Sequence, residues 1–374
     1  MTGASEKPPN PYVGPRAFEE NESQLFFGRD AEIEILAGLV MARRAALLFA
    51  PSGAGKSSLL KAGLIPELTR QETVGRGRRA RTYQKMRVLP VLTVGGPIPA
   101  GMQHPIANVY VFRALLSLQR DADPEALASQ TLVGALASLF GQPEPDAQVP
   151  EASMSPPATL LIFDQFEEIF THDPTRRQDR EGFFQQVNQA LEVYPTLHVL
   201  FSMREDYIAE LTPYTGLLPE QLRPRFRLEF LGEAAALLAI QQPASQAGLE
   251  FTDAAAAALA LDLRRVRVQR LDGTMEQQVG DYVEPVQLQV VCHRLWQKLS
   301  PGATQVVEAD VEAVGDVDSA LAGYYAERVA AIAAETGVSE RTIRDWCDRH
   351  LITEQGIRGQ VLQDQEESQG LANA

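Results

Sequence analysis

The chain has 374 residues, 45% of them hydrophobic, and a formal net charge of −15 at pH 7. This length allows two or three domains with hydrophobic cores, and the composition is that of an ordinary globular protein. The negative charge disfavours general binding to nucleic acid or to anionic membranes, because both repel a surface of the same sign.

Targeting segments are not evident in the sequence. No apolar run approaches the roughly 18 residues of a membrane span, and the N-terminus, MTGASEKPPNPYVGP, lacks the apolar core of a signal peptide. Cys292 and Cys347 form no C-x-x-C pair and are expected to be reduced thiols. We therefore expect a cytoplasmic protein with a flexible, Pro-rich tail over residues 1–11.

The first motif is FFGRD, which ends at Asp30 and precedes a stretch with helical apolar spacing. An apolar pair followed by Gly28 and Arg29 suits a flap that binds a nucleobase by stacking and by backbone hydrogen bonds. The same residues also suit an ordinary turn at the entry of a helix, and the sequence leaves both interpretations open.

The stretch AALLFAPSGAGKSSLL, residues 45–60, predicts a phosphate-binding P-loop. A buried strand, a Gly-rich turn and a helix follow one another, as this motif requires. Lys56 would reach the β- and γ-phosphates, and the Ser57 hydroxyl would bind Mg²⁺. Ala50 replaces the first glycine of G-x-x-x-x-G-K-[ST], which is tolerated when φ is negative. The expected nucleotide contacts are Pro51, Ser52, Gly53, Ala54, Gly55, Lys56, Ser57 and Ser58.

A basic stretch, residues 70–87, contains seven Lys or Arg residues against one acid, Glu72. It could bind an acidic partner or nucleic acid, but Tyr83 is its one aromatic residue, so we favour a solvated insertion loop. We then expect a strand over residues 88–94, helices within 108–141 and a Pro-rich linker over 142–158.

The stretch TLLIFDQFEEIF, residues 159–170, predicts a buried parallel strand that ends at Asp164. Asp164 would hold Mg²⁺, and Glu167 or Glu168 could orient and deprotonate an attacking water. The two glutamates alone would also fit the acidic start of a helix. The P-loop earlier in the chain favours a Walker B motif.

A further apolar strand, LHVLFSMRED, places Arg204 at its carboxyl end, where it could sense a terminal phosphate. Another strand is expected in QLRPRFRLEFL. From residue 231 the chain becomes Ala-rich and helical, with a hairpin around Asp272–Gly273 and an amphipathic helix over 284–299. The last stretch predicts a helix-turn-helix with Ser339 as N-cap and a Gly-containing wing.

The motifs and their order along the chain resemble those of bacterial STAND NTPases, specifically the novel STAND group. The resemblance covers the chain from Tyr12 to about Val361. The resemblance rests on PYVGPRAFEENESQLFFGRD, PSGAGKSSLLKAGLIPEL, LLIFDQFEEIF, LFSMRED, YVEPVQLQVVCHRLW and LITEQGIRGQV. It implies an α/β ASCE-type P-loop core with a parallel sheet flanked by helices. The implied domains are an NTPase domain (12–230), a helical domain with a β-hairpin (231–305) and a winged-helix domain (306–374).

The resemblance also implies roles for single residues. It assigns adenine contacts to Phe27, Gly28 and Arg29, and it makes Glu168 the first and Glu167 the second choice for the base. Arg204 matches the sensor arginine. Pro243 matches the proline of a G-x-P nucleotide contact, although Gln241 replaces its glycine. Arg225 resembles a trans-acting arginine finger only by position, and His350 is a candidate β-phosphate contact in the closed state.

The family implies an ATP/ADP switch that is closed with ADP, self-associates with ATP, hydrolyses ATP slowly with Mg²⁺ and signals in bacterial conflict or anti-phage defence. Its usual sensor and effector parts have no motif in this chain, so we expect them elsewhere in a longer protein or in partners. The alternative is an ATP-controlled winged-helix transcription regulator. Residues 320–374 carry nine acids against five arginines, which disfavours DNA. A metabolic kinase is a poorer third possibility, because no acceptor-site motif is evident.

Overall fold

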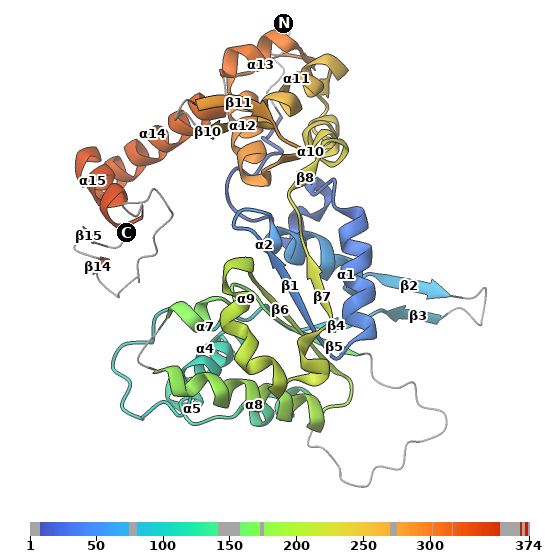
Figure 1. Cartoon of the computed structure of the whole chain (residues 1–374), viewed down its shortest axis with the longest axis vertical. Helices are drawn as coiled ribbons and strands as arrows, with labels where there is room; N and C mark the ends of the chain where they lie inside the picture. Colours follow the sequence, from blue (N-terminus) through green and yellow to red (C-terminus); the bar gives the residue numbers. More distant parts are fainter. Residues whose placement is uncertain are drawn as a thin grey trace, which may run out of the picture. The chain divides into compact units, whose positions relative to one another are not determined.

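The computed structural model divides the chain into two compact units (Figure 1). The first unit consists of residues 1–30, 53–58 and 229–374, and the second of residues 31–52 and 59–228. The structure describes residues 8–74, 81–140, 158–172, 176–269, 275–300, 302–315 and 317–351, together with strands β14 (Glu367–Ser368) and β15 (Leu371–Ala372).

A five-stranded sheet in the order β4-β5-β6-β1-β7 forms the centre of the second unit. Its strands are β1 (Ala45–Ala50), β4 (Arg87–Val88), β5 (Thr159–Phe163), β6 (Leu197–Arg204) and β7 (Arg225–Arg227), and every neighbouring pair is parallel. The register pairs Ala50 with Arg204 and Phe163 with Phe201, so β1, β5 and β6 end along one edge. The predicted α/β fold with a parallel sheet is confirmed.

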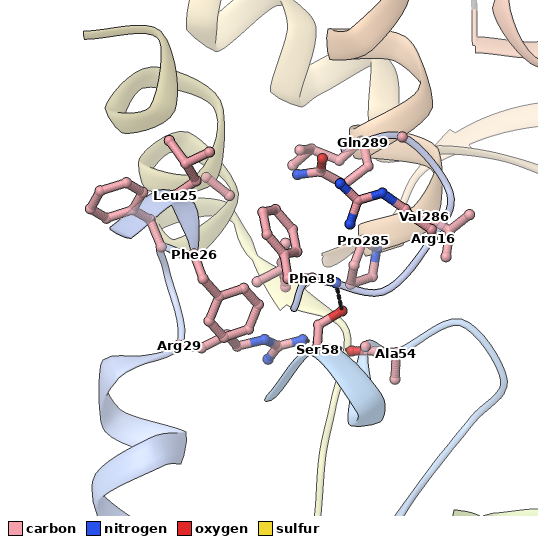
Figure 2. A pocket seen from close by; sticks show the side chains of 16 residues that line it. Arg16, Phe18, Leu25, Phe26, Arg29, Ala54, Ser58, Pro285, Val286 and Gln289 are labelled. Atoms are coloured by element: carbon pink, nitrogen blue, oxygen red, sulfur yellow. Dashed lines mark hydrogen bonds between the residues drawn. The ribbon is translucent and has the colours of Figure 1, made fainter. Parts of the chain in front are cut away.

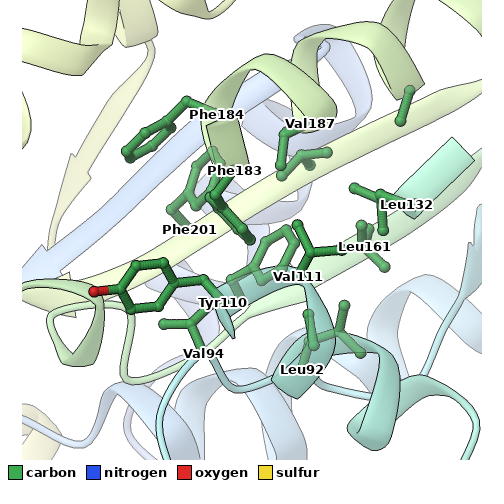
Figure 3. Packing of buried hydrophobic residues seen from close by; sticks show 14 of the residues in the cluster. Leu92, Val94, Tyr110, Val111, Leu132, Leu161, Phe183, Phe184, Val187 and Phe201 are labelled. Carbon is green, nitrogen blue, oxygen red and sulfur yellow. The ribbon is translucent and has the colours of Figure 1, made fainter. Parts of the chain in front are cut away.

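Helices flank this sheet because the strands are apolar on both faces, and every residue of β5 is buried. The helices are α1 (Asp30–Ala42), α3 (Ile65–Thr69), α4 (Val109–Leu118), α5 (Pro124–Leu127), α6 (Leu132–Phe140), α7 (Glu168–Thr171), α8 (Arg177–Val193) and α9 (Ile208–Leu211). Shorter 3-10 turns are η5 (Glu205–Tyr207), η6 (Thr212–Leu217) and η7 (Pro219–Leu222). Figure 3 shows Phe183 and Phe184 of α8 packed near Phe201 of β6.

The helix after the P-loop is irregular. It begins as α2 (Lys56–Ser58), widens into the π-helix η2 (Leu59–Leu64) and returns to α-helical turns in α3. Pro66, near the start of α3, has no N–H for the carbonyl four residues earlier, which disfavours a regular α-helical ladder there.

Two expectations about the region after the P-loop are wrong. The basic stretch is not only a loop, because β2 (Gln71–Val74) and β3 (Arg81–Gln84) pair as an antiparallel ribbon that projects away from the sheet (Figure 1). The strand expected over 88–94 is shorter, with β4 followed by a single bridge at Leu92. Pro90 explains the interruption, since it cannot donate to the ladder.

The first unit is mainly helical, and its core includes Tyr12, Leu288 and Trp296. Its elements are η1 (Glu20–Leu25), α10 (Glu233–Gln246), α11 (Asp253–Leu263), α12 (Pro285–Lys298), α13 (Glu308–Val314), α14 (Val317–Thr336) and α15 (Glu340–His350). Short strand pairs are β8 (Leu231–Gly232) with β12 (Tyr282–Val283), and β9 (Glu250–Phe251) with β13 (Gln305–Val306). The predicted hairpin is confirmed as β10 (Arg265–Gln269) with β11 (Met275–Val279), and the amphipathic helix as α12.

Residues 8–18 form a segment that we call the N-terminal strap. Trp296 donates its indole N–H to the Pro8 carbonyl at 3.2 Å, and the Asn10 amide donates to the His293 carbonyl at 3.0 Å. The Tyr12 hydroxyl donates to the Ile240 carbonyl within the core. The strap is therefore fixed to α10 and α12.

The helix expected at residues 339–349 is present as α15. Its N-cap is Ser339, whose hydroxyl accepts the Thr342 N–H at 3.2 Å. The expected wing begins at Leu351 and, from residue 352, lies outside the described residues, so the winged-helix domain stays a prediction. No helix in the described part of the chain is long and apolar enough to cross a membrane.

Candidate functional site

The P-loop has the local structure that its sequence predicts. It leaves β1 at Ala50, turns at Gly53 (φ +80°) and Gly55 (φ +91°), and enters α2 at Lys56. Both glycines have the left-handed conformation that L side chains rarely adopt, whereas Ala50 is not among the residues with positive φ. The tolerance of Ala at the first motif position therefore has a structural basis.

Gly28 and Arg29 link the P-loop to the chain after residue 228. The Arg29 side chain is buried, and its Nη2 donates to the Ala54 carbonyl at 3.2 Å and to the Glu229 carbonyl at 2.8 Å. Gly28 has φ +81°, and a Cβ there would overlap the carbonyl oxygen of Ala235. FFGRD thus has a scaffold role that neither sequence interpretation included.

A pocket of the first unit adjoins the P-loop (Figure 2). The space it outlines, about 580 Å³, includes its open, solvent-filled mouth. Its lining is mostly apolar, which suits stacking of a planar base. The lining residues are Gly14, Arg16, Phe18, Leu25, Phe26, Phe27, Arg29, Ala54, Gly55, Ser58, Leu231, Ala239, Pro285, Val286, Leu288 and Gln289.

The structure brings only some of the expected nucleotide contacts to this pocket. Phe27, Arg29 and three P-loop residues line it. Pro243 is buried inside α10 and does not line it. His350 does not line it either and lies at the end of α15, its ring 5.5 Å from that of Trp346. A contact between either residue and a nucleotide in this pocket would therefore require a conformation different from the one in this structure.

The sequence motifs did not predict most of the pocket lining, including Phe18, Pro285 and Gln289. Phe18 packs edge-on against Phe26 at 5.4 Å, and its N–H donates to the Ser58 hydroxyl at 3.2 Å. Pro285, the first residue of α12, lies 4.0 Å from a Cβ placed on Gly55. Gln289 accepts the Val13 N–H at 3.0 Å. A Glu-Pro pair before an amphipathic helix was the available signal for Pro285; nothing local marked Phe18 or Gln289.

Asp164 lies directly after β5 at the carboxyl edge of the sheet in the second unit. It is 6% exposed, and its Oδ1 accepts the Ser202 hydroxyl at 2.8 Å. Gln165 adopts φ +52°, a conformation rare outside glycine, and the next N–H, that of Phe166, donates to the Ser202 carbonyl. This turn brings the following glutamates back to the sheet edge.

The two candidate bases have different surroundings. Glu167 is buried, and its Oε2 accepts the Arg204 backbone N–H at 3.2 Å. Glu168 is partly exposed, and burial raises its carboxyl pKa to about 7, helped by the charges of Glu167 and Asp164 and opposed by Arg113 and a backbone hydrogen bond from Gly95. A group with this pKa can exchange a proton near neutral pH, whereas Glu167 has a structural contact to β6.

The two arginines hold local contacts in this structure. The Arg204 Nε donates to Asp206 at 3.1 Å, and its guanidinium lies 5.7 Å from the centre of the Tyr207 ring. Arg225 is exposed on β7, and its Nε donates to the Leu222 carbonyl at 2.9 Å. Arg204 would have to leave Asp206 to bind a phosphate.

Comparison with known proteins places the chain in a family. The family model described as Novel STAND NTPase 1 matches residues 11–352. The chain belongs to this NTPase family. The resemblance stated from the motifs is thereby confirmed.

Two of the solved structures that match this chain are the following. A Walker-type ATPase of Pyrococcus abyssi is 12% identical over 92% of this chain and 81% of its own, with a TM-score of 0.49. The ORC2 protein of Aeropyrum pernix, solved in ADPNP-ADP complexes, is 15% identical over 76% of this chain and 66% of its own, with a TM-score of 0.42. A search of curated proteins finds no match.

Proposed function

We propose that this STAND NTPase is an ATP/ADP switch, closed with ADP and self-associating with ATP. The observation that most supports nucleotide binding is the apolar pocket whose lining includes Ala54, Gly55 and Ser58 of the P-loop. An adenine ring would stack among Phe18, Phe26 and Phe27. The phosphates would bind the loop N–H groups and Lys56.

The chain also has the residue types that Mg²⁺ accepts. Ser57 offers a hydroxyl in the first turn of α2, and Asp164 offers a carboxylate oriented by Ser202. Mg²⁺ prefers such oxygen ligands and would neutralise negative charge on the phosphates when bound. Ser57 and Asp164 are the proposed ligands.

The proposed reaction is slow ATP hydrolysis, with Glu168 as the base that activates water. Burial raises the pKa of its carboxyl to about 7, whereas the Glu167 carboxylate holds the Arg204 backbone N–H. Arg204 would sense the γ-phosphate, because its guanidinium would leave Asp206 and bind the phosphate oxygens instead. Slow turnover suits a switch, since the triphosphate state must persist to be read.

The proposed setting is cytoplasmic conflict or anti-phage signalling, with sensor and effector parts outside this chain. The DNA-binding alternative gains no support from α15, where Arg344 pairs with Glu340 and Arg341 with Asp345. These acids would repel a phosphate backbone.

Sizing by light scattering tests the switch. The purified protein is measured with ADP, then with a slowly hydrolysed ATP analogue, each with and without duplex DNA. A larger species with the analogue alone supports the proposal. An unchanged mass with both nucleotides removes the oligomeric switch, and a nucleotide-dependent shift only with DNA favours the regulator.

A further inference from the structure

The loop between Leu92 and α4 brings a buried glycine against Glu168. A Cβ placed on Gly95 would overlap the Oε2 and Cδ atoms of Glu168 and would lie 2.9 Å from its Cβ. Gly95 is not among the residues with positive φ, whereas the next residue, Gly96, has φ +95°. A side chain at Gly95 is therefore disfavoured by the space that Glu168 occupies, not by backbone conformation.

The backbone around Gly95 is held in place from two sides. Leu92 exchanges hydrogen bonds with the chain of β5, through the Ile162 carbonyl at 2.8 Å and the Asp164 N–H at 2.9 Å. The Thr93 and Ser117 hydroxyls lie 3.3 Å apart, which joins the loop to α4. A side chain at Gly95 could not be relieved by a simple retreat of the loop, so Glu168 would have to move.

We propose that Gly95 is a positioning residue that sets the place of the Glu168 carboxylate at the carboxyl edge of the sheet. The carboxylate has Asp164 and Glu167 as neighbours on its own segment, while the Gly95 backbone and Arg113 of α4 interact with it from other segments. Like charges push it away from the acids, and the hydrogen bond and the guanidinium hold it. The effect on hydrolysis rests on the proposed role of Glu168.

The test is Gly95→Ala, with Gly38→Ala as the matched control. Gly38 lies in α1 of the same unit, and a Cβ there meets no atom within 4 Å. A displacement of about 1 Å can cost about 100-fold in rate. We expect Gly95→Ala to lower kcat for ATP by between about 10-fold and 100-fold while ADP affinity, measured by calorimetry, changes less than about twofold. Gly38→Ala should match the wild type in both.

A second measurement asks whether Gly95 acts through Glu168. Gly95→Ala should cause no further loss of kcat in a Glu168→Gln background, because the positioned group is already inactive. The shift in the urea midpoint caused by Gly95→Ala should likewise shrink in a Glu168→Ala background, where the overlapping carboxylate is gone.

The outcomes separate the two proposals. Wild-type turnover that does not depend on Glu168 removes the proposed base, and the midpoint coupling then decides the contact alone. Glu168-dependent turnover that Gly95→Ala leaves unchanged overturns the positioning role. Additive midpoint shifts, with no coupling between the two sites, overturn the contact itself.

Discussion

At the scale of single residues, the polar side chains of the candidate site differ in what they contact within the fold. Arg29 and Glu167 have chemistry suited to a ligand, yet both hold backbone groups. Glu168 is different, since its environment disfavours its charged form. The predictions about hydrolysis are therefore based on Glu168.

Lys56→Ala should abolish tight nucleotide binding. Lys56 opens the helix that follows the P-loop, so its ammonium is the charge that the motif directs at the β-phosphate. The matched control is Lys61→Ala in η2. Calorimetry with ADP should show little or no heat for Lys56→Ala and normal binding for Lys61→Ala. Near-unchanged affinity in both would remove the P-loop assignment.

Glu168→Gln should leave ATP bound but uncleaved, because the amide cannot accept the proton of water while the proposed Mg²⁺ ligands remain. Wild-type turnover should rise with pH through about 7 as the carboxyl ionises. Single-turnover assays over pH 5.5–8.5 check both points. Loss of turnover in Glu167→Gln alone would show that the base is misassigned.

The same carboxyl predicts a dependence of stability on pH. The pKa of this carboxyl in the folded protein, about 7, lies above its ordinary value of 4.5. Between pH 4.5 and 7 the folded protein therefore binds more protons at this group than the unfolded chain does. Its contribution to stability is complete below pH 4.5 and is lost as pH rises through 7. Glu168→Gln stays neutral and should unfold at higher temperature than wild type at pH 8. Thermal scans at pH 5 should show a smaller difference; an equal difference at both pH values would contradict the raised pKa.

At the scale of elements, the sequence predicted well wherever apolar periodicity was long and uninterrupted. β1, β5, β6, α8 and α12 follow this rule. The strand expected over residues 88–94 is interrupted at Pro90, so only the short strand β4 forms. The basic stretch was expected to be a loop because of its charge, but it forms the ribbon β2–β3. Cross-strand pairing between short polar segments leaves little periodic signal in a single sequence.

The pocket shows the same limit. The P-loop part was predictable because its spacing is fixed within ten residues of chain. Phe18 lies more than 250 residues before Pro285 and Gln289, which share helix α12, and only tertiary packing brings the three together. A local motif can mark the phosphate end of such a site, while the base end is distributed along the chain.

The strap should matter for nucleotide affinity. Phe18 lines the pocket, packs edge-on against Phe26 and donates its backbone N–H to the Ser58 hydroxyl. Phe18→Ala removes the ring and should weaken ADP binding by roughly tenfold, the loss expected for about 1–2 kcal/mol of aromatic contact. Tyr282→Ala, an exposed aromatic of the same unit outside this pocket, should leave the affinity unchanged. Equal affinity in both variants would place the base elsewhere.

At the scale of the whole molecule, the proposed switch depends on parts that move between two states. α15 ends at His350, which contacts Trp346 and not the pocket in this structure. A phosphate contact by His350 would therefore belong only to a closed ADP state and would bias the equilibrium toward it.

His350→Ala should weaken ADP binding more than ATP binding and increase the open fraction. Loss of one hydrogen bond to a charged group costs about 1.5–3 kcal/mol, enough to shift a closed-to-open ratio by roughly tenfold or more. His104→Ala, which removes a surface histidine paired with Glu125, is the control. Equal ADP affinity and unchanged sizing profiles in His350→Ala would make His350 a bystander.

The π-helix η2 has a consequence for how this region tolerates changes in length. A π turn takes in one residue more than an α turn, so Leu59–Leu64 holds surplus chain directly after the P-loop helix. Deleting a single residue there would remove the wide turn and keep Ile65 and Leu68 in their buried positions, although Pro66 would still leave one hydrogen bond of the α-helical ladder unmade. In most buried helices, a one-residue deletion rotates every later side chain by about 100° about the helix axis. Here the π turn contains one residue that can be lost without that rotation, so we expect homologues one residue shorter at this point to keep the same core.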